Sequence, residues 1–198
     1  HERLAVGQAS GAGFDEIFAL AQEIPIGEGP AVDDSAVRER AALALGRLRD
    51  RDALPLLETL ITDPDIQVRA VAAYSLGQTP ESREAILRAL EIENHSRVRT
   101  RLVAALGFHA VDADISLLVS LLEASPSIRR EAAIDLGRLK LSGSESVDQP
   151  EIVSALSDAL GGFEPSTRRA VAFALSRIQP TEMTDPTWND LSHAAGND

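Results

Sequence analysis

The stretch "VRAVAAYSLGQ", residues 68–78, decides the fold, because the chain repeats it with small changes. The other copies are "VRERAALALGR" from Val37, "VRTRLVAALGF" from Val98, "IRREAAIDLGR" from Ile128 and "TRRAVAFALSR" from Thr167. A period of about 30 residues is typical of solenoids, in which one small unit stacks on the next. Within the quoted copy, Val68, Ala72 and Leu76 lie four residues apart, which indicates a helix with one apolar stripe.

Shorter amphipathic segments lie between these copies and predict the other helix of each pair. They are "FDEIFALAQEI" from Phe14, "ALPLLETLI" from Ala53, "PESREAILRALEI" from Pro80, "DISLLVSLLEA" from Asp114 and "PEIVSALSDAL" from Pro150. Because one helix pair cannot bury both of its apolar faces, stacked pairs share a continuous core. The sequence therefore predicts an all-α fold, a right-handed α-α superhelix of about five helix pairs.

The predicted domain organisation follows from the positions of the copies. We expect a flexible N-terminal segment at 1–13, a repeat domain at 14–180, and a C-terminal cap or tail at 181–198. The repeats are expected at about 14–49, 50–79, 80–110, 111–140 and 148–180, with a surface loop at 141–150 before the last one.

Two features recur in the copies at fixed positions. An arginine follows the first apolar residue in each, as Arg38, Arg69, Arg99, Arg129 and Arg168. We interpret these arginines as structural, because a long stem can cover the core while the guanidinium reaches carbonyls or carboxylates of the adjacent repeat. A glycine closes four copies, as Gly46, Gly77, Gly107 and Gly137. It permits either close packing against a neighbouring helix or a helix end, and the sequence leaves both open.

The segments "DPDIQVRAVAAYSLGQ" from Asp63 and "DDSAVRERAALALGRLRDRDALPLLETLITD" from Asp33 resemble HEAT repeats of the short bacterial type. The resemblance covers roughly residues 33–180 and implies an α-solenoid that binds partners along a groove lined by its second helices. The succession "AAYSLGQ", "GRLKLSG" and "AVAFALSRI" also resembles HEAT regions attached to bacterial cyclophilin-type peptidyl-prolyl isomerases. No cyclophilin region occurs in these residues, so isomerase activity is not assigned to them.

Helical geometry selects candidate binding residues on the face opposite the apolar stripe, at positions 1, 2, 5 and 9 after each repeated arginine. In a HEAT-like stack this face lines the concave groove. The candidates are Arg40, Leu43, Arg47, Tyr74, Gln78, Arg101, Phe108, Arg130, Ile134, Arg138, Arg169, Phe173 and Arg177. Apolar side chains flanked by arginines suit a protein or peptide segment with acidic and apolar residues. The alternative is that the apolar side chains pack against neighbouring repeats and the arginines are simply solvated.

Composition limits the other function classes. The chain has 198 residues, no cysteine and a net charge of -12, which argues against a general nucleic-acid binder. No apolar run approaches the roughly 20 residues of a membrane span. The histidines His1, His95, His109 and His193 lack a paired metal-ligand spacing, and we predict no metal, cofactor or catalytic residue.

The predicted function is a non-enzymatic scaffold that binds a protein or peptide in the groove. The alternatives are an accessory module of a larger enzyme such as a cyclophilin-type isomerase, nucleic-acid binding through the groove arginines, and tetrapyrrole-linked lyase chemistry. The first residue is His1 and the only methionine is Met183, so we interpret the chain as processed or excised. Its compartment stays open between the bacterial cytoplasm and the cell envelope.

Overall fold

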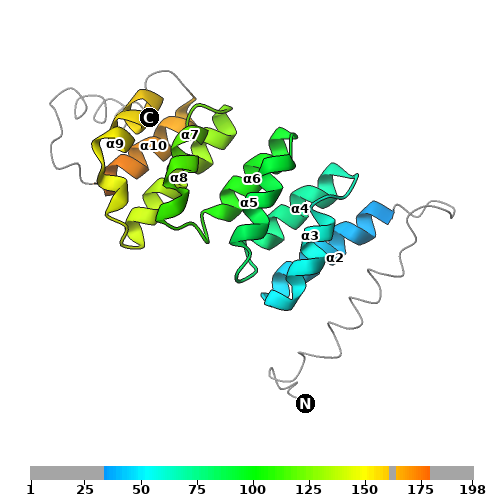
Figure 1. The fold of residues 1–198 in the computed structure, drawn as a ribbon. Helices are drawn as coiled ribbons and strands as arrows, with labels where there is room; N and C mark the ends of the chain where they lie inside the picture. Colours follow the sequence, from blue (N-terminus) through cyan, green and yellow to red (C-terminus); the bar gives the residue numbers. More distant parts are fainter. Residues whose placement is uncertain (1–33, 161–163, 179–198) are drawn as a thin grey trace, which may run out of the picture.

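The computed structural model describes residues 34–160 and 164–178, and every regular element in this part of the chain is a helix (Figure 1). The second helices of the pairs are α2 (Asp34–Leu48), α4 (Ile66–Leu76), α6 (Ser96–Leu106), α8 (Pro126–Leu141) and α10 (Pro165–Arg177). The first helices are α3 (Leu54–Leu60), α5 (Arg83–Ile92), α7 (Ile115–Leu121) and α9 (Pro150–Leu160). Short 3₁₀ turns are η1 (Arg51–Ala53), η2 (Asp112–Asp114) and η3 (Ser146–Asp148). The helix predicted from Phe14, the segment 1–13 and the tail 181–198 lie outside the described residues.

The helices form two layers, one made of the second helices and the other of the first helices. In one layer α2 packs on α4, α4 on α6, α6 on α8 and α8 on α10. In the other layer each first helix packs mainly on its own second helix, α3 on α4, α5 on α6, α7 on α8 and α9 on α10. Figure 1 shows these pairs in succession from α2 to α10. This arrangement confirms the predicted all-α solenoid.

The beginnings of the second helices follow local sequence signals. The Asp65 carboxylate accepts hydrogen bonds from the backbone N–H groups of Gln67 at 2.6 Å and Val68 at 3.3 Å, and so caps α4. Pro126 and Pro165 occupy the first turns of α8 and α10, where a missing N–H removes no intrahelical hydrogen bond.

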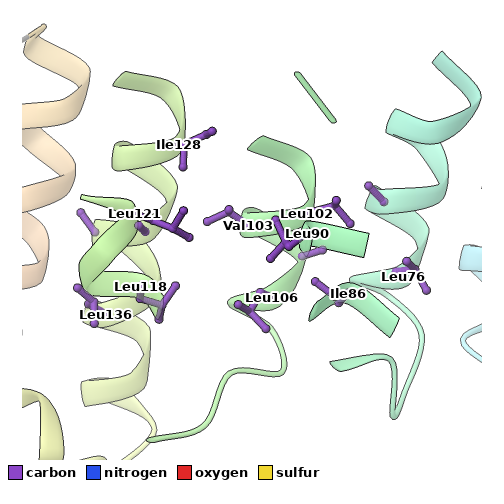
Figure 2. Packing of buried hydrophobic residues seen from close by; sticks show 14 of the residues in the cluster. Leu76, Ile86, Leu90, Leu102, Val103, Leu106, Leu118, Leu121, Ile128 and Leu136 are labelled. Atoms are coloured by element: carbon purple, nitrogen blue, oxygen red, sulfur yellow. The ribbon is translucent and has the colours of Figure 1, made fainter. Parts of the chain in front are cut away.

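The core runs continuously between the two layers. Fully buried leucines and isoleucines come from every helix pair, among them Leu57, Leu76, Ile86, Leu102, Leu118, Leu136 and Leu156. Figure 2 shows how such residues of the central pairs, from Leu76 and Ile86 to Leu118 and Leu136, follow one another through the interior. Burial of one such side chain contributes about 1.5–3 kcal/mol. Each pair therefore depends on its neighbours for much of its stability.

The repeated glycines serve close packing of the second helices. The facing residues are Ser75 for Gly46, Ala105 for Gly77, Asp135 for Gly107, and Phe173 with Ala174 for Gly137. A methyl group on Gly77 would lie 3.0 Å from the Cα atom of Ala105, so a larger residue would separate α4 from α6. Gly77 and Gly107 both have helical φ angles, and among the described glycines a positive φ occurs only at Gly143. All four glycines therefore show close packing. α4 and α6 also end at Gly77 and Gly107, so both uses that the sequence left open occur there, although their helical φ angles do not by themselves require glycine.

Candidate functional site

The candidate site is the second-helix surface, the solvent side of α2, α4, α6, α8 and α10. Positions 2, 5 and 9 after each repeated arginine lie within about 60° of one another on a helix, so they form three rows across the stack. Row 2 holds Arg40, Val71, Arg101, Glu131 and Ala170; row 5 holds Leu43, Tyr74, Ala104, Ile134 and Phe173; row 9 holds Arg47, Gln78, Phe108, Arg138 and Arg177. Arg130 and Arg169, one position after the repeated arginine, lie at the edge of these rows.

The apolar members of these rows differ in exposure. Tyr74 is 46% exposed and Phe108 is 59% exposed, so both rings stand in solvent. Leu43, Ile134 and Phe173 are half-buried, and Ile134 packs against the core. Packing between repeats therefore accounts for Ile134 but leaves Tyr74 and Phe108 as apolar surface on α4 and at the end of α6.

Arginines toward the C-terminal end of this surface already have partners in the chain. Arg130 donates hydrogen bonds to Glu131 Oε1 from Nη2 at 2.5 Å and from Nε at 3.1 Å. Arg138 Nη1 donates to Asp135 Oδ1 at 3.0 Å, and its guanidinium lies 4.8 Å from the centre of the Phe108 ring. Both guanidinium groups on α8 therefore already have hydrogen-bond acceptors on the same helix.

Cation–π geometry recurs on the last helix. The guanidinium of Arg177 lies 5.5 Å from the centre of the Phe173 ring on α10. Arg169 is exposed in the first turns of the same helix.

Arginines toward the N-terminal end differ from those on α8. Arg40, Arg47 and Arg101 are exposed, and none of them forms an ion pair with a residue that the structure describes. Arg97 is likewise exposed and lies four residues before Arg101, hence on the same face of α6. Sequence reasoning missed Arg97, although this spacing could have revealed it. Gln78, just after the end of α4, is half-buried and accepts a hydrogen bond from Arg49 Nη2 at 3.4 Å.

Asp135 is a second residue that sequence reasoning missed. It is fully buried on α8, its Oδ1 atom accepts the bond from Arg138, and its Oδ2 atom has no hydrogen-bond partner. Burial raises the pKa of this carboxyl well above its ordinary value of 3.8, and the neighbouring Glu131 adds to the rise while Arg138 opposes it. A comparison of the copies could have revealed Asp135. Six residues after the repeated arginine, the other copies have small residues, namely Ala44, Ser75, Ala105 and Ala174.

The repeated arginines bind the connections between first and second helices. Arg38 on α2 reaches the next repeat, where it donates to Asp63 from Nε to Oδ2 at 2.6 Å and from Nη2 to Oδ1 at 3.0 Å. Arg69 on α4 donates from Nε to Glu93 Oε2 at 2.7 Å, again in the next repeat, and from Nη1 to the carbonyl oxygen of Asp63 at 2.8 Å. Both arginines thus fasten two repeats together.

The following two repeated arginines bind the connection within their own repeat. Arg99 Nη1 donates to the carbonyl oxygens of Leu90 and Glu93, both at 2.8 Å. Arg129 donates to the carbonyl oxygens of Leu122 and Ala124. Arg168 is half-buried on α10. These contacts lie away from the three rows of the second-helix surface.

In the described part of the chain, the histidines and carboxylates form no group of three or more that could hold a metal ion. His109 Nε2 lies 3.2 Å from the carbonyl oxygen of Gly77, and His95 is an exposed residue before α6. Among residues 34–160 and 164–178, no helix is long and apolar enough to span a membrane.

Stacked helix pairs with a shared core place this chain in the class of all-α solenoids. A family model of HEAT repeats matches it at residues 31–107 and again at 59–137, which together cover more than half of the chain. The chain belongs to the HEAT-repeat family. No curated protein matches the sequence.

Proposed function

We propose that the chain is a non-catalytic scaffold that binds a protein or peptide segment on its second-helix surface. The segment carries acidic and apolar side chains, with its acidic groups toward α2 and α6. HEAT repeats are commonly scaffolds for protein interaction, and the family membership supports this general role.

One observation carries the proposal: exposed arginines that form no ion pair with a described residue flank an exposed aromatic ring. Arg40 on α2 and Arg101 on α6 lie in row 2 on either side of α4, whose Tyr74 is 46% exposed in row 5. Elsewhere in this acidic chain, exposed arginines such as Arg51 and Arg88 are paired with glutamates. Positive charge that no described residue compensates, in a protein of net charge -12, favours an acidic ligand at this place.

The arrangement suits a segment that runs across the helices. Neighbouring packed helices lie about 8–10 Å apart, so Arg40 and Arg101, with α4 between them, are separated by roughly two such spacings. An extended segment with carboxylates at both ends of that span can place an apolar side chain on Tyr74 in the middle. Arg47 and Arg97 extend the positive charge to both sides of this line.

A selection experiment tests the proposal. Random peptides displayed on phage are selected on the immobilised chain, and the recovered sequences are synthesised with a fluorophore. Binding is then measured by fluorescence anisotropy for the parent chain, an Arg40→Glu/Arg101→Glu variant and an Arg51→Glu/Arg88→Glu variant. The two variants carry the same change in net charge, but the second places it away from the second-helix surface.

We expect the selected peptides to be enriched in Asp and Glu together with Leu, Ile or Phe. Reversal of Arg40 and Arg101 weakens their binding about tenfold or more, because each exposed ion pair contributes up to about 1 kcal/mol and the new glutamates repel the carboxylates of the peptide. The control variant binds like the parent. Peptides without acidic residues, or equal loss in both variants, would contradict the proposed surface.

A further inference from the structure

The junction between α6 and α8 differs from the other contacts between second helices. At each contact a repeated glycine faces the residue six positions after the next repeated arginine, and that residue is Ser75 or Ala105 at the first two contacts. At the α6–α8 contact it is Asp135, whose carboxylate lies directly on Gly107. A methyl group on Gly107 would come within 1.8 Å of Asp135 Oδ1, so glycine is needed to accommodate the acid.

The carboxylate of Asp135 is incompletely satisfied in this position. It has no solvent exposure, one oxygen is bound by Arg138, and the other has no hydrogen-bond partner. An ionised carboxylate in such a place loses hydration that one hydrogen bond does not replace. The protonated form loses much less, so the closed junction favours a neutral Asp135.

The charged side chains that influence Asp135 are on its own helix. They are Arg138, which favours the ionised form, and Glu131, which opposes it. The residue of α6 that lies against the carboxylate is the uncharged Gly107. His109 follows α6, but its ring contacts the carbonyl oxygen of Gly77, which lies at the other junction of α6.

We propose that the α6–α8 junction is a proton-controlled hinge of the solenoid, closed when Asp135 is protonated and readily opened when Asp135 is ionised. Opening hydrates the carboxylate and removes the desolvation that the closed packing imposes. Neighbour-only contacts make such a local opening possible, because the repeats on each side keep their own cores. The hinge is a property of the scaffold and does not depend on the identity of a partner.

Opening of this junction would alter the second-helix surface. Arg138 from α8 lies over the Phe108 ring at the end of α6, so this pair spans the junction. Separation of the two helices breaks that contact and divides the surface into a part on α2, α4 and α6 and a part on α8 and α10. Protonation of one buried carboxyl thereby sets whether the surface is continuous.

Hydrogen exchange resolved by residue tests the hinge. Protection factors, which divide out the intrinsic exchange rate, are measured from about pH 4 to about pH 8 for the parent chain and for Asp135→Asn and Asp135→Ala. The alanine variant reproduces the packing at Ala105, and the asparagine variant keeps the size of the side chain. The amides of α4 facing α6 serve as an internal reference, and His109→Gln controls for histidine titration.

In the parent chain, protection at the facing turns of α6 and α8 falls by up to about tenfold per pH unit above the ordinary carboxyl pKa, because opening then releases one proton. Both Asp135 variants lose this dependence and are more protected at neutral pH, whereas His109→Gln behaves like the parent. Equal pH dependence in the parent and both variants, or protection in the parent that does not change with pH, would overturn the proposal.

Discussion

Two neighbouring junctions of the solenoid, α4–α6 and α6–α8, use carboxylates in opposite ways. At α4–α6 the helices meet through Gly77 and Ala105, and the acid is Glu93, held outside the helix contact by Arg69 and by the backbone N–H of His95 at 2.7 Å. At α6–α8 the acid is Asp135, inside the helix contact itself. An ionised carboxylate therefore stabilises one junction and destabilises the other, depending on how many hydrogen bonds its oxygens accept.

The two acids give the junctions opposite responses to pH. Burial opposes ionisation of Glu93, but the hydrogen bonds from Arg69 and from backbone N–H groups prevail and lower its pKa below 4.5. Its contribution is therefore present above pH 4.5 and is lost as the pH falls through the lowered pKa. Burial raises the pKa of Asp135, so its contribution is present below pH 3.8 and is lost as the pH rises toward the raised pKa.

The largest effect is expected when a buried acid is introduced at the α4–α6 junction, which has none inside its helix contact. Ala105→Asp places a carboxylate against Gly77, where the residue three positions later is Phe108 and supplies no guanidinium. We expect a loss of about 3 kcal/mol or more at neutral pH in an Arg101→Gln background, where the guanidinium four residues earlier on α6 is absent and the buried charge has no partner. Urea unfolding measures it, with Ala113→Asp at an exposed position as control. A loss no larger than in the control would show that the junction tolerates a charge.

Removal of the fastening acid gives the next largest effect. Glu93→Gln keeps the size of the side chain but loses the charged hydrogen bond from Arg69, so we expect a loss of about 2 kcal/mol at neutral pH. The difference from the parent shrinks in acid, since the parent then loses the same ionised group. Denaturation at several pH values measures both effects. Glu84→Gln, at an exposed glutamate paired with Arg83, should change little at any of them.

A double-mutant cycle measures the coupling between Gly107 and Asp135 at the α6–α8 contact. Gly107→Ala overpacks the space held by the Asp135 carboxylate and should cost about 1–3 kcal/mol. In an Asp135→Ala background the same substitution should cost less, because the nearest clash is with a side chain that is then absent. Thermal unfolding of the four proteins gives the coupling energy. Equal costs in both backgrounds would place the clash in the backbone instead.

The smallest expected effect concerns the ring that spans the hinge. Phe108→Leu removes the ring under the Arg138 guanidinium and should cost about 0.5 kcal/mol, as for other exposed cation–π contacts. In an Arg138→Met background the substitution should cost nothing further. Chemical denaturation of the cycle measures this coupling, and an unchanged cost without Arg138 would assign the effect to simple apolar burial.

The fold was predictable because its determinants are repeated along the chain. Val68, Ala72 and Leu76 give the helical period in one copy, and four further copies exclude a chance pattern. The same repetition could not distinguish close packing from a helix end at Gly77, because both uses favour glycine. That distinction depends on the distance to Ala105, which is a property of the folded stack.

For the candidate site, the sequence predicted only which side chains lie on the helix face opposite the apolar stripe. Helical geometry places Tyr74 and Phe108 toward solvent, and the structure leaves both exposed. It does not reveal that Arg130 and Arg138 are already bound by Glu131 and Asp135 within α8, because such pairing depends on side-chain conformation. Binding by the predicted site residues stays a prediction.

The well-buried ion pairs between repeats have a direction that bears on how such an array can grow. Arg38 binds Asp63, Arg69 binds Glu93, and Arg83 on α5 binds Asp114 at 2.6 Å, each time from one repeat to the next. The helix pair α3–α4 contains both an acceptor, Asp63 between the two helices, and a donor, Arg69 on α4. A tandem duplication of that helix pair would therefore place an arginine opposite a carboxylate at the new boundary. The array can lengthen by gene duplication in its existing order, whereas a helix pair inserted in the reverse orientation would not bring these partners together.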